Sequence, residues 1–241
     1  MSNVAIIFAG GTGQRMNTRT VPKQFLEVHG KPIIIYTIEH FENHPEVDGI
    51  VVVCLESWIP QLKRLLKKFA IEKVAAIVPG GDSGQHSIRN GLYKAHELFS
   101  EDSIVMLHDG VRPLINADII SDNIRTAREK GNAITVSKAI ETIVITPEDS
   151  RDSVESVMDR SRCLMARAPQ SFVLRDLYEA HQRADAEGFA DAIDSAMLMR
   201  RYGATLHTVE GIPENIKITT PNDFYMFRAL LDMQETSQIL G

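Results

Sequence analysis

The sequence has few cysteines, no long hydrophobic run and no excess of positive charge. Its 241 residues include two cysteines, Cys54 and Cys163, so a disulfide framework is excluded, and neither has a companion at metal-ligand spacing. No apolar run approaches the roughly 20 residues that span a bilayer. The N-terminus also lacks the cationic segment of a signal peptide. We therefore expect a reduced, cytoplasmic protein with no membrane partner.

The charge balance is acidic. Lys and Arg total 26 against 32 Asp and Glu, which gives a formal net charge of −6. Proteins that bind nucleic acid polymers need a dense cationic surface, so we expect no nucleic acid partner. The chain has no linker, internal repeat or low-complexity tract, and we expect a single domain over residues 1–241.

Short apolar runs alternate with helical patterns along most of the chain. Continuous apolar runs of this length are typical of strands buried on both faces of a parallel sheet. The alternation predicts an α/β fold with a mostly parallel central sheet. The expected strands are Val4–Ala9, Gly49–Leu55, Val74–Val78, Ser103–Leu107, Ala133–Val136 and Thr205–Val209. The expected helices are Ile33–Asn43, 58–69, 88–99, Ala117–Lys130, Leu174–Glu187, Ala192–Tyr202 and Asn222–Glu235.

One stretch, residues 141–173, breaks this alternation. It is polar and charged, with two short apolar segments and no helical stripe. This pattern predicts an extended hairpin, with its turn near residues 147–150. An isolated hairpin is only marginally stable in water, so we expect this β-arm to pack on a second copy of the chain as a homodimer.

A glycine-rich turn follows the first expected strand. Ala9, Gly10, Gly11 and Gly13 would allow backbone N–H groups to approach a phosphate closely. The spacing fits neither the dinucleotide fingerprint nor the P-loop, and glycine-rich turns after strands are common. Two cations that flank this turn, Arg15 and Lys23, strengthen the case for a triphosphate.

A second glycine turn precedes the helix expected at 88–99. Gly81 and Asp82, followed by Ser87, supply backbone and short polar groups that could read the edge of a base. An ordinary helix start explains the same residues.

Two further groups lie in positions that favour ligand binding. Asp109 and Arg112 follow an expected buried strand, and ligands in open α/β sheets bind at the carboxyl ends of strands. Asp109 could bind a metal or a sugar hydroxyl, and Arg112 a phosphate, or the two could form a structural ion pair. Lys217 lies in a β-like stretch before Pro221, where it faces either solvent or an anion.

Taken together, the motifs resemble the cytidylyltransferase family of methylerythritol-phosphate and ribitol-5-phosphate cytidylyltransferases, over nearly the whole chain. The matching motifs are Gly-Gly-x-Gly-x-Arg-Met, Pro-Lys-Gln, Gly-Gly-Asp with Ser87, His-Asp-x-x-Arg-Pro, Pro169-Gln170-x-Phe172 and Asn-Ile-Lys-x-Thr. The resemblance implies a Rossmann-like nucleotidyltransferase fold, a homodimer with interlocked arms, and a divalent ion, usually Mg²⁺. It also implies transfer of CMP from CTP to a polyol phosphate.

The resemblance assigns a role to each matched residue. The catalytic cations are Arg15, Lys23 and Lys217; the nucleotide-binding residues are Ala9, Gly10, Gly11, Gly13, Gly81, Asp82 and Ser87; the acceptor-binding residues are Asp109, Arg112, Thr142 and Arg160. Asp109 is also the candidate metal ligand. Thr142 and Arg160 lie on the arm and match residues that face the acceptor, in part across the dimer interface.

The chain departs from the family pattern at three places. Gly84 replaces a common arginine, Ala168 replaces a threonine beside the acceptor phosphate, and Ile193 replaces a threonine before Asp194. Phe8-Ala9-Gly10-Gly11 and the segment around Thr142 resemble the ribitol-phosphate branch, which serves cell-wall polysaccharides. We therefore expect D-ribitol 5-phosphate as the acceptor. The alternatives are 2-C-methyl-D-erythritol 4-phosphate, for isoprenoid synthesis, and a catalytically silent nucleotide-binding regulatory protein.

Overall fold

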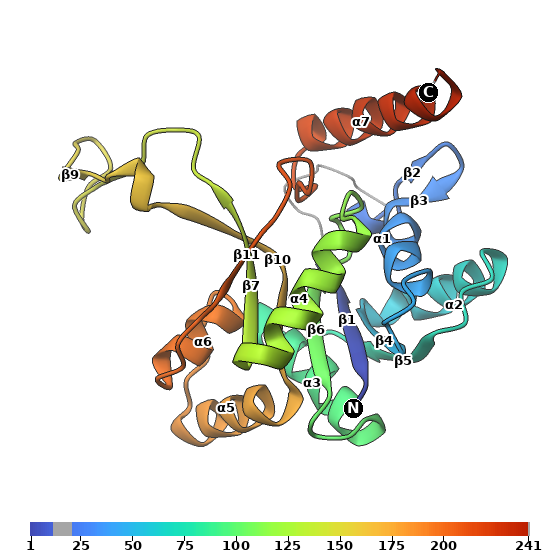
Figure 1. The fold of residues 1–241 in the computed structure, drawn as a ribbon, viewed down its shortest axis with the longest axis horizontal. Coiled ribbons are helices and arrows are strands. Elements are labelled where there is room, and N and C mark those ends of the chain that lie inside the picture. The colour runs from blue at the N-terminus through green and yellow to red at the C-terminus, as the bar shows by residue number, and fades with distance from the viewer. Residues whose placement is uncertain (12–20, 241) are drawn as a thin grey trace.

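The computed structural model describes residues 1–11 and 21–240, and within this part the chain forms an α/β fold around one large sheet (Figure 1). The strands are β1 (Asn3–Ala9), β2 (Glu27–Val28), β3 (Lys31–Pro32), β4 (Gly49–Cys54), β5 (Val74–Pro79), β6 (Ile104–Asp109), β7 (Asn132–Lys138), β8 (Val144–Ile145), β9 (Ser156–Val157), β10 (Leu164–Val173) and β11 (Thr208–Glu210). The α-helices are α1 (Ile33–Glu42), α2 (Ile59–Lys68), α3 (Gly84–Leu98), α4 (Ala117–Lys130), α5 (Leu174–Glu187), α6 (Ser195–Arg201) and α7 (Pro221–Leu240). Short 3₁₀ helices span Lys23–Phe25, Glu56–Trp58 and Arg160–Arg162.

The central sheet has the strand order β11-β7-β10-β6-β1-β4-β5. Every neighbouring pair is parallel except those of β10, which runs antiparallel to both β6 and β7. The predicted α/β fold with a mostly parallel sheet is therefore confirmed. Sequence periodicity did not separate β10 from the arm that precedes it.

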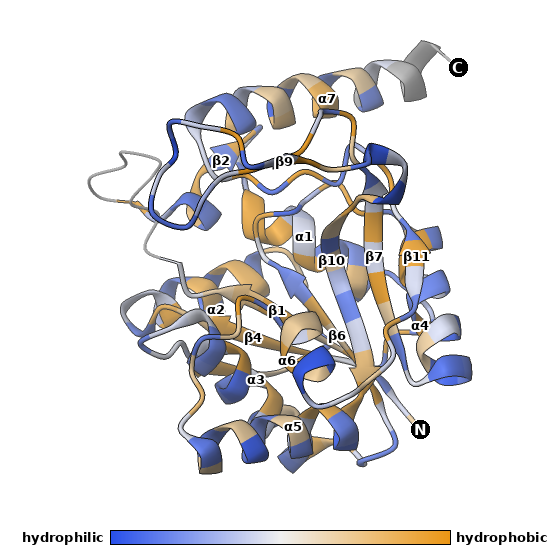
Figure 2. Ribbon diagram, turned by 90° about the vertical axis from the view of Figure 1, so that its left-hand side faces the viewer, coloured by the Kyte–Doolittle hydropathy of each residue, from blue (hydrophilic) through white to orange (hydrophobic). Residues whose placement is uncertain are grey.

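Successive side chains along each strand point to opposite faces of the sheet and pack in two separate hydrophobic layers. In β1, Ala5 and Ile7 pack with α1, α2 and α4, whereas Val4 and Ile6 pack on the other face with α3, α5 and α6. Both faces of the strand are buried because helices cover both sides of the sheet, which explains the continuous apolar runs. The strands are correspondingly hydrophobic, and the helices carry hydrophilic residues (Figure 2).

The glycine turns and the Arg112 segment all follow the carboxyl ends of parallel strands, at one edge of the sheet. The chain leaves β1 into the glycine turn, β5 into Gly80, and β6 into the segment that contains Arg112. Because β10 is antiparallel, its first residues lie at this same edge. Helix α7 lies beyond this end of the sheet (Figure 1) over a third hydrophobic cluster that includes Ile33, Ile218 and Phe227.

The arm protrudes from the same edge as an extended, two-stranded excursion (Figure 1). Its short strands β8 and β9 pair antiparallel, and Ser150 N donates to Pro147 O at the turn, as predicted. The predicted range of 141–173 is too long at its C-terminal end. Gln170–Val173 pair with β6 inside the central sheet, and Phe172 is fully buried, because β10 fills the gap between β6 and β7.

Candidate functional site: a cleft at the carboxyl edge of the sheet

The glycine turn after β1 is fixed by a buried glutamine. Gln24 Nε2 donates to Ala9 O at 2.5 Å and to Gly11 O at 3.2 Å. The 3₁₀ helix that carries Gln24 also carries Lys23, so the same short segment fixes the turn and brings a cation to the cleft. The predicted residues Gly13 and Arg15 lie outside the described residues.

The second glycine turn packs directly on the first. A Cβ atom on Gly10 would lie 3.7 Å from Gly80 Cα, so a side chain on Gly10 would touch the second turn. Gly81 N donates to Ser87 Oγ at 3.0 Å, and a Cβ atom on Gly81 would lie only 2.5 Å from His86 Cβ. The close approach explains the need for glycine at position 81, and Ser87 holds the turn in place.

Helix α3 begins at this turn with a side-chain cap. Ser83 Oγ accepts a hydrogen bond from His86 N at 3.1 Å. Gly84, where the family pattern has arginine, is the first residue of the helix and has no neighbouring atoms that would obstruct a side chain.

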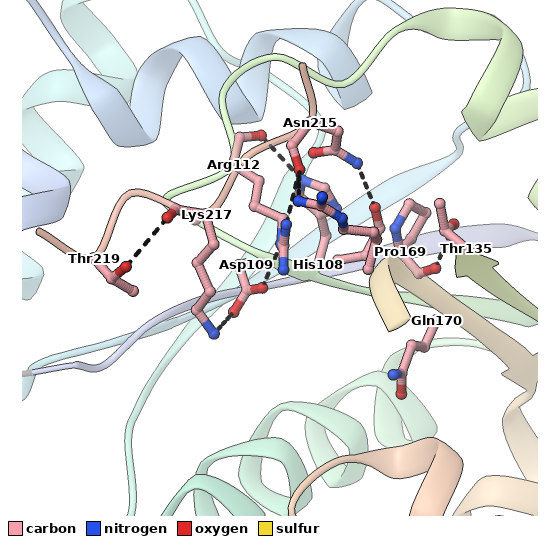
Figure 3. A network of polar contacts seen from close by, with 12 residues as sticks. His108, Asp109, Arg112, Thr135, Pro169, Gln170, Asn215, Lys217 and Thr219 are labelled. Carbon is pink, nitrogen blue, oxygen red and sulfur yellow. Dashed lines mark hydrogen bonds and ion pairs between the residues drawn. The ribbon is translucent and has the colours of Figure 1, made fainter. Parts of the chain in front are cut away.

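An ion-pair network lies where β6 ends (Figure 3). One carboxylate oxygen of Asp109 accepts from Lys217 Nζ at 2.8 Å, and the other accepts from Arg112 Nε at 2.8 Å. Burial raises the pKa of Asp109, but Lys217 and Arg112 outweigh that effect and bring the pKa down to about 2. Asp109 is therefore ionised at neutral pH and offsets only part of the positive charge of its two partners.

The neighbouring histidine is neutral and structural. His108 is fully buried, and burial lowers its pKa to about 4. Its Nε2 lies 3.2 Å from Arg112 O, and its ring packs on Phe41. His108 does not titrate near neutral pH and holds the backbone that carries Arg112.

The segment that carries Lys217 is not a strand, contrary to the β-like pattern of its sequence. Residues 215–219 are irregular, because buried polar contacts replace sheet pairing. Asn215 Nδ2 donates to Ala168 O at 2.7 Å, and Ile218 N donates to Val111 O at 2.9 Å. Asp223 accepts from both Thr219 N and Thr219 Oγ1, so the first turn of α7 fixes the residues just after Lys217.

These segments surround a cleft of about 720 Å³, within the range of small-molecule sites. Most of the predicted site residues line it: Ala9, Gly10, Gly11, Lys23, Gly81, Asp82, Ser87, Asp109, Arg112 and Lys217. Thr142 and Arg160 do not, because both lie on the protruding arm, where Arg160 Nη1 donates to Ile140 O at 3.0 Å.

Further cleft residues were not predicted as site residues: Gln24, Arg167, Gln170, Asp194 and Thr219. Gln24 and Gln170 lie in the quoted motifs Pro-Lys-Gln and Pro-Gln, which are signals that could have indicated them. No sequence signal indicated Arg167, because only the fold brings residue 167 next to residue 112.

The carboxylates do not form a preformed metal cage. Within the described residues, no group of three His, Cys, Asp or Glu could hold a metal ion. Both oxygens of Asp109 already accept from cationic groups. Mg²⁺ commonly binds through one or two carboxylates together with substrate phosphates and water, so Asp109 could supply one ligand at most.

The fold and the site define a Rossmann-like nucleotidyltransferase: glycine turns and cations converge at the carboxyl edge of a mostly parallel sheet, the edge at which ligands of open α/β sheets bind. Residues 3–233 match the family model of 2-C-methyl-D-erythritol 4-phosphate cytidylyltransferase. The chain belongs to this cytidylyltransferase family.

Relatives named for ribitol 5-phosphate are more similar in sequence to this chain than a relative named for the methylerythritol phosphate. A ribitol-5-phosphate cytidylyltransferase of Vibrio parahaemolyticus is 52% identical over 99% of this chain and 100% of its own length. One of Streptococcus agalactiae is 50% identical over the full length of both. A 2-C-methyl-D-erythritol 4-phosphate cytidylyltransferase of Clostridium acetobutylicum is 37% identical over 95% of this chain and 97% of its own.

A solved structure matches the fold over almost the whole chain. The 4-diphosphocytidyl-2C-methyl-D-erythritol synthase of Anaerococcus prevotii superposes with a TM-score of 0.81 at 26% identity, and the match covers 96% of each chain. No helix of the described residues is both long and apolar enough to cross a bilayer.

Proposed function

We propose that this protein transfers CMP from CTP to D-ribitol 5-phosphate, giving CDP-ribitol and pyrophosphate. The choice of D-ribitol 5-phosphate as the acceptor rests on sequence identity. The chain is 50–52% identical to relatives named for ribitol 5-phosphate, against 37% to a relative named for the methylerythritol phosphate. The cleft supports the chemistry, because its glycine turns and cations suit a triphosphate beside a second phosphate.

In this proposal the residues of the chain bind and align rather than abstract a proton. The acceptor is a phosphate monoester, whose second pKa of ~6 leaves it largely dianionic at neutral pH. An acceptor phosphate oxygen forms a bond to the α-phosphorus of CTP as the bond to pyrophosphate breaks. Lys23, Arg112 and Lys217 hold the phosphates and offset the charge that develops.

A Mg²⁺ ion would enter with CTP and neutralise part of the charge on its phosphates. Asp109 is the one predicted ligand from the chain, and its contacts with Arg112 and Lys217 would have to loosen for it to bind the ion. We also propose a cytoplasmic location, which the low cysteine content supports.

The acceptor test compares two polyol phosphates. The purified protein is incubated with CTP, Mg²⁺ and either D-ribitol 5-phosphate or 2-C-methyl-D-erythritol 4-phosphate, and pyrophosphate release is followed. We expect kcat/KM to be at least tenfold higher with the ribitol phosphate. The reverse preference would establish the isoprenoid alternative, and CTP binding without turnover of either acceptor would establish the regulatory one.

The variant Lys23→Ala tests the phosphate-side assignment. We expect kcat/KM to fall about 100-fold or more, the scale of losing one transition-state donor. Lys63→Ala, at an exposed position on α2, is the matched control and should behave as the wild type. If Lys23→Ala also retains wild-type kcat/KM, the catalytic role of Lys23 is wrong.

We further propose that the arm forms a homodimer and carries Thr142 and Arg160 to the partner's cleft. Two facts support this: neither residue lines the cleft of its own chain, and the arm exposes apolar side chains such as Val154, at 56%, and Val157, at 63%.

Mixing two impaired variants tests the exchange. If Arg160 acts in the partner's cleft, a heterodimer of Lys23→Ala and Arg160→Ala chains contains one cleft with both residues intact. Unfolding and refolding the mixture should therefore restore activity that neither variant has alone. Light scattering that gives a monomer, or a mixture with no restored activity, would refute the exchange.

A further inference from the structure

Arg167 lies at an irregularity in the pairing of β10, and its side chain lines the cleft. The pairing register of β10 with β7 shifts between Ala166 and Gln170, so Arg167 falls in the unpaired stretch. Such irregularities redirect side chains next to binding sites. Arg167 lines the cleft, together with Arg112 and Lys217.

Two buried hydrogen bonds to the irregular stretch itself hold its backbone in place. Asn215 Nδ2 donates to Ala168 O at 2.7 Å, and Thr135 Oγ1 donates to Pro169 O at 2.7 Å (Figure 3). Thr135 in turn accepts from Asn123 Nδ2 at 2.9 Å. The base of the Arg167 side chain is therefore fixed before any ligand binds, which lowers the entropy cost of binding.

Among the residues that the structure describes, the guanidinium of Arg167 has only neutral partners. Its Nε donates to Ser137 Oγ at 3.0 Å, and its Nη1 donates to Asn215 O at 3.4 Å. No ion pair of Arg167 is found within residues 1–11 and 21–240. An arginine carries five N–H donors, so these two contacts leave three available.

A second guanidinium converges on the same carbonyl oxygen. Arg112 Nη1 donates to Asn215 O at 2.8 Å. Burial lowers the pKa of Arg167, and the positive charge of Arg112 lowers it further. Asp109 pairs with Arg112 and Lys217, and Asp194 accepts from Gln170 Nε2, so the three cations Arg112, Arg167 and Lys217 outnumber the two carboxylates at this end of the cleft.

Two positions at this end have apolar side chains where the family pattern has hydroxyl groups. Ala168 and Ile193, where the family pattern has threonines, both line the cleft. Ala168 and Ile193 therefore supply no side-chain hydrogen bond to an anion bound here, whereas Arg112 and Arg167 carry N–H donors that can.

The position of β10 in the sheet separates Arg167 from the nucleotide turns. The order β10-β6-β1-β4-β5 puts β10 two strands from the glycine turn after β1 and four from the turn after β5. At ~4.8 Å per strand, the start of β10 lies roughly 10 Å from the first turn, on which the second turn packs. An anion at Arg167 is therefore better explained as part of the acceptor than as the base or terminal phosphate of CTP.

We propose that Arg167, together with Arg112, binds the phosphate of the acceptor and so determines affinity for it. This inference rests on the proposed function in that the acceptor carries a phosphate monoester. A planar guanidinium can donate two parallel hydrogen bonds to two phosphate oxygens, which the unpaired N–H groups of Arg167 allow.

The variant Arg167→Gln removes the charge and keeps a hydrogen-bonding side chain. We expect KM for the acceptor to rise at least tenfold, KM for CTP to stay within twofold, and the melting temperature to stay within about 2 °C, as for changes that spare the core. Arg167→Lys, which keeps the charge and loses the fork, should give an intermediate KM for the acceptor. Arg125→Gln, at an exposed site on α4, is the matched control and should leave both KM values unchanged.

Inhibition by inorganic phosphate supplies a binding readout that is independent of the acceptor's identity. In the wild type, inorganic phosphate should compete with the acceptor, and its inhibition constant should rise at least fivefold in Arg167→Gln.

Three outcomes would overturn the proposal. A rise in KM for CTP that equals the rise for the acceptor would place Arg167 on the nucleotide. A fall in melting temperature and kcat with no change in KM for the acceptor would show that Arg167 has a structural role, through its contacts with Ser137 of β7 and with Asn215. If Arg167→Gln binds inorganic phosphate as tightly as the wild type does, as measured by calorimetry in the presence of CTP, Arg167 does not contact the phosphate.

The wild type by itself shows whether the proposed function is wrong, separately from the role of Arg167. If the wild type uses only the methylerythritol phosphate, the same KM comparison is made with that acceptor. If it uses neither, the calorimetric comparison of inorganic phosphate binding decides the role of Arg167.

Discussion

Replacing Asp109 with asparagine keeps the shape of the side chain and removes the negative charge between two cations. Three-quarters of the Asp109 side chain is buried, and Arg112, at 9% exposure, is almost completely so. The pKa of Asp109 falls from 3.8 to about 2, because Lys217 and Arg112 outweigh the effect of burial. At 1.36 kcal/mol per unit, that difference stabilises the fold by about 2 kcal/mol at neutral pH.

We therefore expect Asp109→Asn to lower the free energy of unfolding by about 2–3 kcal/mol, toward the low end for one partner of a buried pair. The lower end applies because Lys217 is 45% exposed and Arg112 keeps its contact with Asn215 O. In a domain of this size the melting temperature should fall by roughly 4–10 °C. Urea unfolding, followed by the fluorescence of Trp58, the single tryptophan, measures the difference.

The contribution of Asp109 to the free energy of unfolding decreases as the pH falls. Because the pKa of Asp109 is lower in the folded protein, its contribution is complete above pH 3.8 and is lost as the pH falls toward 2. The stability difference between wild type and variant should therefore shrink below about pH 4. A double-mutant cycle with Lys217→Met should give a coupling free energy of about 1 kcal/mol. An Asp109→Asn protein as stable as the wild type at pH 7 would refute this account of the network.

Two further variants test the packing and the buried histidines. Gly91→Ala should destabilise the fold by about 1–3 kcal/mol through overpacking, because its Cβ would lie 2.6 Å from Val53 and 2.7 Å from Ile6; Gly84→Ala, with open space at its Cβ, is the control in the same helix, and equal urea midpoints for the two variants would contradict the expectation. Burial lowers the pKa of His181 from 6.5 to about 4, so the unfolded chain takes up a proton first as the pH falls, and the wild type should lose about 2 kcal/mol between pH 7.5 and 5 from this group. His181→Leu should lose less over the same range, as read from urea midpoints at the two pH values, and an identical loss would mean that His181 does not titrate in this way.

Most of the fold could be predicted from local patterns. The buried strands are continuous apolar runs because helices cover both faces, and α4 and α5 have the predicted bounds. The strand β10 could not be predicted, because Leu164–Ala166 pair with β7 alone, whereas Gln170–Phe172 pair with both β6 and β7. Likewise, the irregular segment at Lys217 has a β-like sequence, but its backbone bonds to Val111 instead of to a strand.

The sequence by itself determined the family, the two glycine turns and the cations near them, since these depend on residue type and spacing along the chain. The tertiary structure decided which charges offset one another. Asp109 pairs with Lys217, more than a hundred residues away, and Arg112 and Arg167 converge on one carbonyl oxygen. Such contacts depend on strand order and on the antiparallel direction of β10, which no local pattern of the chain contains. For this reason the excess positive charge at Arg167 became visible only in the folded protein.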